Sequence, residues 1–381
     1  MAVMALAVVS CGRGGEPGVT LAVSVDSSGP YPVVRSTGTP PRWTAELIAT
    51  VGADTGGPYE FGAITSVVLG ANGSLYVLDL TMRQLSAFDS LGMFTVRLGR
   101  RGRGPGEYRY PLSIAMLHDS VVVFDPDGRK YLLFEPGGTW MRDLPAAALT
   151  GPEDVILYRT PPDAFWTSGR FRQVGGISAV FVRHESAGAV DTITARRPQL
   201  ARFPGVSCFV ANGGISFYDA PFGPRRFARP TRSGSQAVAI NSSYRVWFLS
   251  RTGDTLRALD RPVEPGPVPE GDWVEEIEKW QAWRTKAGNP QCTGAAFTRP
   301  ETRPVLEWMF LDDVGQLWIE SYTAEGHRYE VFGEDGALRA VVTGLPPSRG
   351  VDPSVAAGRI ALSVPDSNDI PRVQVYRIRK P

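Results

Sequence analysis

The sequence predicts an all-β protein built from several similar sheets, and three observations predict it. Glycine and proline are abundant, with 42 and 32 copies among 381 residues, above the average for globular chains but below the share typical of disorder. Apolar residues make up 43% of the chain, enough to bury a core. Short apolar runs alternate with turn residues, and this pattern recurs along the chain.

The recurring unit has a period near 46 residues, which is typical of repeated β-units. Asp79 in one copy matches Asp125 in the next, and Arg83 matches Arg129. The three clearest copies are residues 66–98, 113–142 and 310–339.

Each copy has the pattern of one small antiparallel sheet. Runs such as Leu75–Leu78 and Val121–Phe124 are rich in β-branched and aromatic residues and too short for helices. Pairs such as Asn72-Gly73 separate them and tolerate the positive φ of hairpin turns. Because one such sheet cannot bury both faces alone, the copies must stack, and a radial arrangement leaves only short edges. The predicted architecture is therefore a β-propeller.

Fainter copies extend the ring to six blades, with seven blades as the alternative. They are residues 152–197, 205–260 and 352–379. Strand-like material at Val19–Ser36 is expected to pair with the C-terminal unit, because joining both chain ends in one blade removes an unpaired edge. The expected plan is a signal segment at 1–11, a linker with the candidate closing strand at 12–40, and a single propeller domain at 41–381.

One segment departs from the β pattern and predicts a helix at 272–287, in an insertion covering about residues 265–300 between the fourth and fifth blades. Asp272 and Glu275 resemble a capping box, and Glu275 and Lys279 form a favourable i,i+4 pair. Tryptophans at helical spacing are expected to pack on the parent domain, with a partner-binding face as the alternative.

The first ten residues, MAVMALAVVS, are apolar or small. They are too few to span a bilayer, so they predict an export signal. Val8–Cys11 resembles the lipobox of bacterial lipoproteins, although no Lys or Arg precedes the apolar run. The resemblance implies a lipid on Cys11 and a place in the bacterial cell envelope, at its periplasmic or outer surface.

The two remaining cysteines are Cys208 and Cys292. An exported protein meets an oxidising compartment, where such a pair can form one disulfide. Two buried free thiols are the alternative.

Residues Leu98–Tyr108, LGRRGRGPGEY, followed by Pro111, resemble the inter-blade signature of NHL-repeat-like six-bladed β-propellers found in bacterial lipoproteins. Asp125 and Arg129 stand where that pattern has its Asp and Arg. The resemblance is close over residues 60–145 and partial over 303–340. It implies a propeller fold, and most proteins of this kind have binding or scaffolding roles, although the fold itself hosts many unrelated activities.

Charge and motifs limit the chemistry. A formal net charge of +1 gives no field for polyanions, so no nucleic-acid partner is expected. The Gly-rich loop lacks a P-loop motif and is interpreted as a turn between blades. Four residues of that stretch are kept as a weak candidate anion or ligand site: Arg101, Arg103, Glu107 and Tyr108.

No catalytic residue, cofactor or metal site is predicted. The three histidines, His118, His184 and His327, have no metal-ligand spacing, and no nucleophile elbow is present. These observations favour a monomeric, non-catalytic module that binds a protein or a small molecule. The alternative is a metal-dependent lactonase- or lyase-like enzyme with its site in the central channel, whose ligands would be scattered over several blades.

Overall fold

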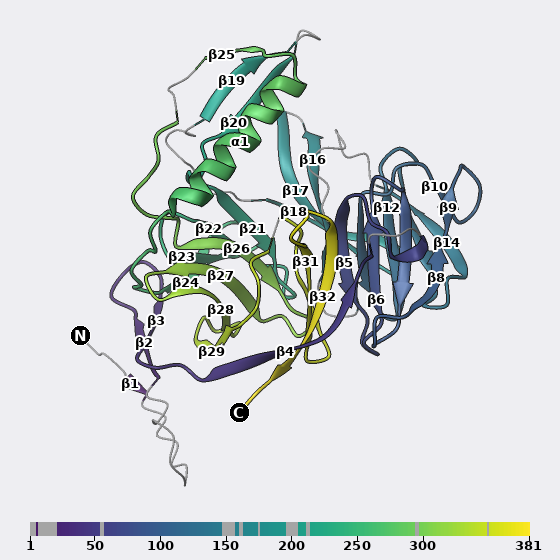
Figure 1. Cartoon of the computed structure of the whole chain (residues 1–381). Helices are drawn as coiled ribbons and strands as arrows, with labels where there is room; N and C mark the ends of the chain where they lie inside the picture. Colours follow the sequence, from purple (N-terminus) through teal and green to yellow (C-terminus); the bar gives the residue numbers. More distant parts are fainter. Residues whose placement is uncertain are drawn as a thin grey trace.

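A computed structural model of the chain describes residues 5–6, 21–53, 57–146, 157–159, 163–173, 176–195, 205–210, 214–293, 297–348 and 350–381. The described residues form an all-β ring of six blades with one α-helix (Figure 1). The predictions of a six-bladed propeller and of an inserted helix are therefore confirmed.

Blades 1 and 2 follow the clearest repeats, and each is an antiparallel sheet of four strands. Blade 1 consists of β5 (Ile64–Leu69), β6 (Leu75–Asp79), β7 (Gln84–Phe88) and β8 (Phe94–Leu98). Blade 2 consists of β11 (Ser113–Leu117), β12 (Ser120–Asp125), β13 (Lys130–Phe134) and β14 (Trp140–Pro145). The matching Gly92 and Gly138 both adopt positive φ, 82° and 90°, in the last hairpin of their blades.

Blades 3 and 4 continue the ring. Blade 3 consists of β15 (Leu157–Arg159), β16 (Phe165–Gln173), β17 (Gly176–Glu185) and β18 (Gly188–Thr194). Blade 4 consists of β21 (Arg226–Pro230), β22 (Gln236–Ile240), β23 (Arg245–Leu249) and β24 (Thr255–Asp260). Its outer edge is extended by β3 (Val33–Thr37), β2 (Ala22–Asp26) and the two-residue β1 (Ala5–Leu6).

Blades 5 and 6 share a strand from the start of the chain. Blade 5 consists of β26 (Leu306–Leu311), β27 (Leu317–Thr323), β28 (Gly326–Phe332) and β29 (Leu338–Thr343). Blade 6 consists of β30 (Ser354–Ala356), β31 (Arg359–Pro365), β32 (Pro371–Arg379) and β4 (Arg42–Val51). A 3₁₀ turn at Gly57–Tyr59 leads from β4 towards blade 1.

The expectation that Val19–Ser36 closes the ring is wrong, because the closing strand is β4. It pairs antiparallel with β32 along most of its length, and its first residues pair parallel with β29. Trp43 and Val51 of β4 are buried, so this strand contributes apolar surface to the ring. β3 pairs instead with β24 of blade 4.

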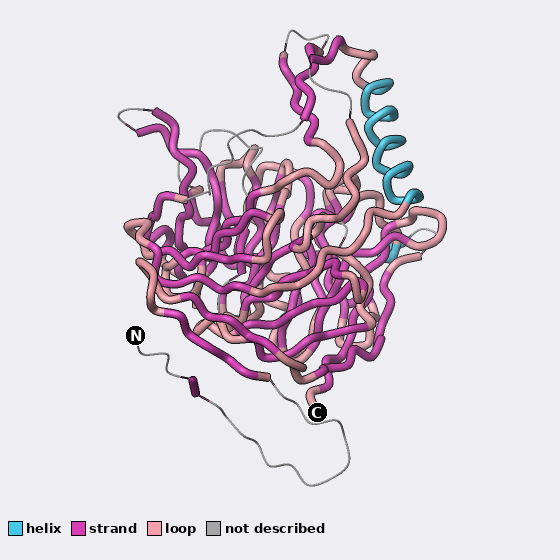
Figure 2. The backbone as a smooth tube through the Cα atoms, turned by 90° about the vertical axis from the view of Figure 1, so that its left-hand side faces the viewer, coloured by secondary structure: helices cyan, strands magenta, loops and turns pink. Residues whose placement is uncertain are grey.

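A second correction concerns residues 205–219, which sequence repetition had assigned to blade 4. They form β19 (Gly205–Phe209) and β20 (Ile215–Asp219), which pair with β25 (Gln291–Thr293) in a separate three-stranded sheet. Figure 2 shows this projecting sheet and the helix standing out from the propeller on the side away from the C-terminus. Cys208 and Cys292 lie opposite each other on β19 and β25, with Cα atoms 4.0 Å apart, and form a disulfide.

The helix α1 (Glu270–Lys286) begins two residues before its expected start. Its N-cap is Pro269 without a side-chain hydrogen bond, so the expected capping box at Asp272 and Glu275 is wrong. The rings of Trp280 and Trp283 lie 6.5 and 5.6 Å from that of Tyr218 on β20. The helix is therefore packed against the disulfide-linked projecting sheet.

The innermost strands surround a narrow central channel, and serine hydroxyls join neighbouring blades there. Each hydroxyl accepts a hydrogen bond from a backbone N–H of the next inner strand: Ser354 from Leu69 at 2.9 Å, Ser66 from Ile114 at 3.3 Å, and Ser113 from Leu157 at 3.2 Å. These polar side chains thus serve the closure of the ring.

Candidate functional site

The Gly-rich loop after blade 1 satisfies its own hydrogen-bond donors. The carboxylate of Glu107 accepts hydrogen bonds from the backbone N–H groups of Arg103 and Gly104, at 3.0 and 2.9 Å, and pairs with Arg100 at 2.7 Å. The hydroxyl of Tyr108 is buried and donates to the carbonyl of Leu98 at 3.0 Å.

Within this loop, β9 (Arg100–Arg101) and β10 (Glu107–Tyr108) pair as short parallel strands. Arg101 and Arg103 are exposed. Because Glu107 already occupies the backbone donors that an external anion would use, the geometry of this loop is that of a turn between blades.

The repeated acidic residues at the ends of the second strands also bind backbone. Asp79 accepts hydrogen bonds from the N–H groups of Gly62 at 2.6 Å and Met82 at 2.9 Å. Asp125 accepts from Arg109 and Tyr110 in the same way, at 2.9 and 3.0 Å. In blade 4 the first residue after β22 is Asn241, and its side-chain oxygen accepts from the N–H of Arg225 at 2.6 Å. We use the name turn latch for these contacts, in which the side chain of Asp79, Asp125 or Asn241 accepts hydrogen bonds from backbone N–H groups.

The centre of the ring leaves little room. The cavity there has a volume of about 50 Å³, the space of one or two water molecules at ~30 Å³ each. Asp352 lies in its lining, forms an ion pair with Arg229 at 3.1 Å and accepts a hydrogen bond from the indole N–H of Trp308 at 2.6 Å. Among the described residues, no three His, Cys, Asp or Glu side chains gather closely enough to hold a metal ion.

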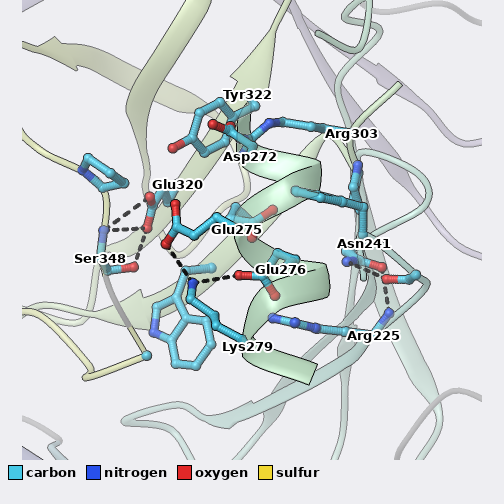
Figure 3. Close-up of a pocket in the computed structure, with 17 residues that line it drawn as sticks. Arg225, Asn241, Asp272, Glu275, Glu276, Lys279, Arg303, Glu320, Tyr322 and Ser348 are labelled. Atoms are coloured by element: carbon cyan, nitrogen blue, oxygen red, sulfur yellow. Dashed lines mark hydrogen bonds and ion pairs between the residues drawn. The ribbon is translucent and has the colours of Figure 1, made fainter. Parts of the chain in front are cut away.

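A larger cavity, of about 430 Å³, lies between α1 and the ends of blades 4 and 5. We call it the rim pocket, and Figure 3 shows its side chains. In that view, Glu320 and Ser348 lie on one side of α1, and Asn241 and Arg225 lie on the other. The charged residues in its lining are Arg225, Asp272, Glu275, Glu276, Lys279, Arg303, Glu307 and Glu320.

The helix supplies charged side chains that are already paired. Lys279 lies 2.7 Å from a carboxylate oxygen of Glu275 and equally close to one of Glu276. Asp272 forms an ion pair with Arg303, whose guanidinium lies 4.2 Å from the centre of the Tyr322 ring. The pairs of Lys279 lie within α1, whereas the Asp272–Arg303 pair holds the helix to the connection before blade 5.

Glu320, on β27, is fully buried at the opposite wall. One of its carboxylate oxygens lies 2.9 Å from Nε2 of His327 and accepts from the N–H of Ser348 at 3.2 Å. The hydroxyl of Ser348 donates to the other oxygen. Glu320 therefore fixes the segment that joins blades 5 and 6.

Glu307 owes its direction to an irregularity in β26. Leu306 pairs with Ser321 and Trp308 pairs with Glu320, so Glu307 is the extra residue of a β-bulge. Bulges re-aim a side chain and are frequent beside binding sites. Here the bulge places a half-buried carboxyl in the lining of the rim pocket.

Burial raises the pKa of Glu307 above its ordinary range. The carboxylates of Glu320 and Glu276 act in the same direction, whereas the guanidinium groups of Arg225 and Arg303 lower this pKa. Charged groups on α1, on β27 and on the segments before β21 and β26 therefore all act on the Glu307 carboxyl.

Sequence motifs did not reveal this site. Its residues come from α1, from the entries to β21 and β26, and from β27, which are distant in sequence. The available signal was an acidic residue inside an apolar strand, as in LEWMFL for Glu307 and LWIES for Glu320. Cys11 lies outside the described residues. No helix among the residues described combines the length and apolar character needed to cross a membrane.

Comparison with known proteins supports the architecture. Residues 55–148, which include blades 1 and 2, match a family model described as a 6-bladed beta-propeller. No curated protein sequence matches the chain.

Solved propeller structures resemble the chain weakly. A Bacteroides fragilis protein provisionally described as exported has 9% identity and a TM-score of 0.40, over 89% of this chain and 99% of that one. Regucalcin from Agrobacterium tumefaciens, a calcium-binding protein, has 12% identity and a TM-score of 0.39, over 91% and 98%. Virginiamycin B lyase from Staphylococcus aureus has 7% identity and a TM-score of 0.36, over 94% and 88%. This similarity carries no argument about ligands, and the chain is a six-bladed β-propeller by its own strand pairing.

Proposed function

We propose that this six-bladed β-propeller is a non-catalytic binding protein of the bacterial cell envelope and that its ligand is a small polar molecule held in the rim pocket. The observation that carries the proposal is a cavity of about 430 Å³ lined by charged side chains from blades 4 and 5 and from α1. Pockets for small molecules have volumes of roughly 300–1,000 Å³ and few, well-placed polar groups.

Ligand-detected NMR with amino acids, dipeptides, sugars, organic acids, amines and nucleosides tests the pocket. Glu276 faces the cavity from α1, so Glu276→Trp should fill it, whereas Glu278→Trp on the exposed face of the same helix is the matched control. We expect compounds that bind the wild type and the Glu278→Trp variant but not the Glu276→Trp variant. Equal binding to all three proteins, or no binding at all, would reject the pocket as the functional site.

The envelope location is proposed from the lipobox-like Val8–Cys11 and is consistent with the Cys208–Cys292 disulfide, since disulfides persist in oxidising compartments. Cells fed labelled palmitate should label the wild type and not a Cys11→Ala variant. Equal labelling of the two, or none in either, would remove the lipid anchor from the proposal without affecting the pocket.

A further inference from the structure

The charges around the rim pocket divide into paired and unpaired groups. Lys279 is neutralised by two glutamates of its own helix, and Arg303 is paired with Asp272. These ion pairs are partly exposed; those of Lys279 lie within α1, and the Asp272–Arg303 pair holds α1 in place. A ligand does not have to break them in order to enter.

Two side chains of opposite charge remain. Within the described part of the chain, neither the guanidinium of Arg225 nor the carboxyl of Glu307 has a hydrogen bond or ion pair; the bond to Asn241 is from the Arg225 backbone. Both line the same cavity, and Arg225 is among the charges that act on Glu307. One small molecule can therefore contact both.

The backbone that carries each of the two side chains is held in place. Glu307 is the bulge residue of β26, and the N–H of Arg225 is held at 2.6 Å by the turn latch of Asn241. Such positioning lowers the entropy that a ligand must offset on binding.

The two groups favour complementary ligand charges. A guanidinium presents a planar fork of donors that matches a carboxylate. A partly buried carboxylate is costly to keep ionised, and an ammonium group beside it offsets that cost.

We infer that the rim pocket selects a small zwitterion, whose carboxylate binds Arg225 and whose ammonium group binds Glu307. Free amino acids and short peptides have this chemistry. The inference rests on the proposed function, because it names the class of ligand for the same pocket. The aromatic rings of Trp308, Tyr322 and Phe222 complete the lining and suit the apolar part of such a ligand.

The test is calorimetry with probes that separate the two charges. L-alanine, L-alanyl-L-alanine and 6-aminohexanoate carry both groups at increasing separations, butyrate and butylamine carry one each, and glucose carries neither. We expect at least one zwitterion to bind and the single-charge probes to bind at least tenfold more weakly, the order of magnitude for losing one charged hydrogen bond.

Variants assign the two contacts. Arg225→Met and Glu307→Gln should each weaken binding of the zwitterion at least tenfold. Arg101→Met, in the exposed inter-blade loop, and Glu278→Gln, on the outer face of α1, are the matched controls and should leave it unchanged.

The outcomes separate the two proposals. Zwitterion binding that both pocket variants leave intact overturns the inference. Binding of glucose, butyrate or butylamine alone, abolished by Glu276→Trp, also overturns it while the proposed pocket stands. If no probe binds and the wider NMR panel also gives no ligand, both proposals fall.

Discussion

Blades 1 and 5 have the same strand order and differ in where their acidic side chains stand. Each inner strand has a β-bulge, at Thr65 in blade 1 and at Glu307 in blade 5. On the second strand, opposite the residue that precedes the bulge, blade 1 has Asp79 and blade 5 has Ser321. The repeat is thus conserved in backbone geometry and altered in chemistry.

The difference separates a structural role in blade 1 from the binding role that we propose for blade 5. In blade 1 the carboxylate of Asp79 is occupied by backbone donors. In blade 5 the acidic residues stand elsewhere, at Glu320, which holds Ser348, and at Glu307, which lines an open cavity. Under the proposed function, blade 5 lacks the latch of blade 1 and carries instead a carboxyl at the bulge that faces the ligand.

The largest expected effect comes from removing a latch. Asp79→Ala should lower the free energy of unfolding by about 4 kcal/mol, because three partly buried hydrogen bonds lose their charged acceptor. Chemical denaturation measures it. Asp79→Asn should cost less, since an amide oxygen serves the same purpose at Asn241.

Asp89→Ala is the control for this change, because Asp89 accepts two N–H groups in an exposed turn of the same blade. Its cost should stay below about 1 kcal/mol. If Asp79→Ala is equally mild, or if it abolishes ligand binding in the folded protein, the division between latch and pocket is wrong.

The second expected effect is a loss of stability at low pH. It comes from His184 in blade 3, which does not line the rim pocket. His184 is fully buried, with Nε2 3.0 Å from the hydroxyl of Thr167 and its ring stacked on Phe165 at 4.8 Å. Burial lowers its pKa from 6.5 to about 4. The unfolded chain therefore binds this proton more tightly, and stability should fall as the pH drops from about 6.5 to about 4, by roughly 3 kcal/mol in total.

Urea denaturation across this pH range gives the measurement. The difference between wild type and His184→Gln isolates the contribution of one histidine from that of the carboxyl groups. His118→Asn changes an exposed histidine at a positive φ of 52°, which asparagine tolerates, and should leave the pH profile as it is. Parallel profiles for wild type and His184→Gln would contradict the assignment.

The smallest expected change in stability comes from giving blade 5 the residue of blade 1. Glu307→Thr should change the free energy of unfolding by no more than about 1 kcal/mol, because it removes a half-buried carboxyl without a partner among the described residues. Thermal denaturation measures the change in stability, and calorimetry with a zwitterion that binds the wild type measures the change in affinity. A strongly destabilised variant would show that Glu307 supports the fold.

The ring was predictable because its causes are local. Turn pairs such as Asn72-Gly73 and strands such as Val121–Phe124 act within a few residues, and repetition multiplies the signal. Asp125, which the repeat places level with Asp79, accepts backbone hydrogen bonds as Asp79 does. α1 was found because its periodicity differs from that of the strands around it.

The errors arose where distant segments meet. β4 and β3 are both strand-like, and only their packing decides that β4 closes the ring and β3 extends blade 4. The projecting sheet depends on β25, which lies far from β19 along the chain. Arg225 and Glu307 come to line the same cavity through tertiary structure alone, so no spacing in the sequence could reveal them.

The strand β4 also governs the order in which the molecule can be completed. A chain made from its amino end holds Arg42–Val51 without its antiparallel partner until Pro371–Arg379 has been synthesised. The last steps of assembly must therefore bring together the most widely separated segments, and contacts of this kind slow folding. Until β32 is made, the earlier blades form an incomplete ring, and the unpaired edge of this ring is exposed to neighbouring chains.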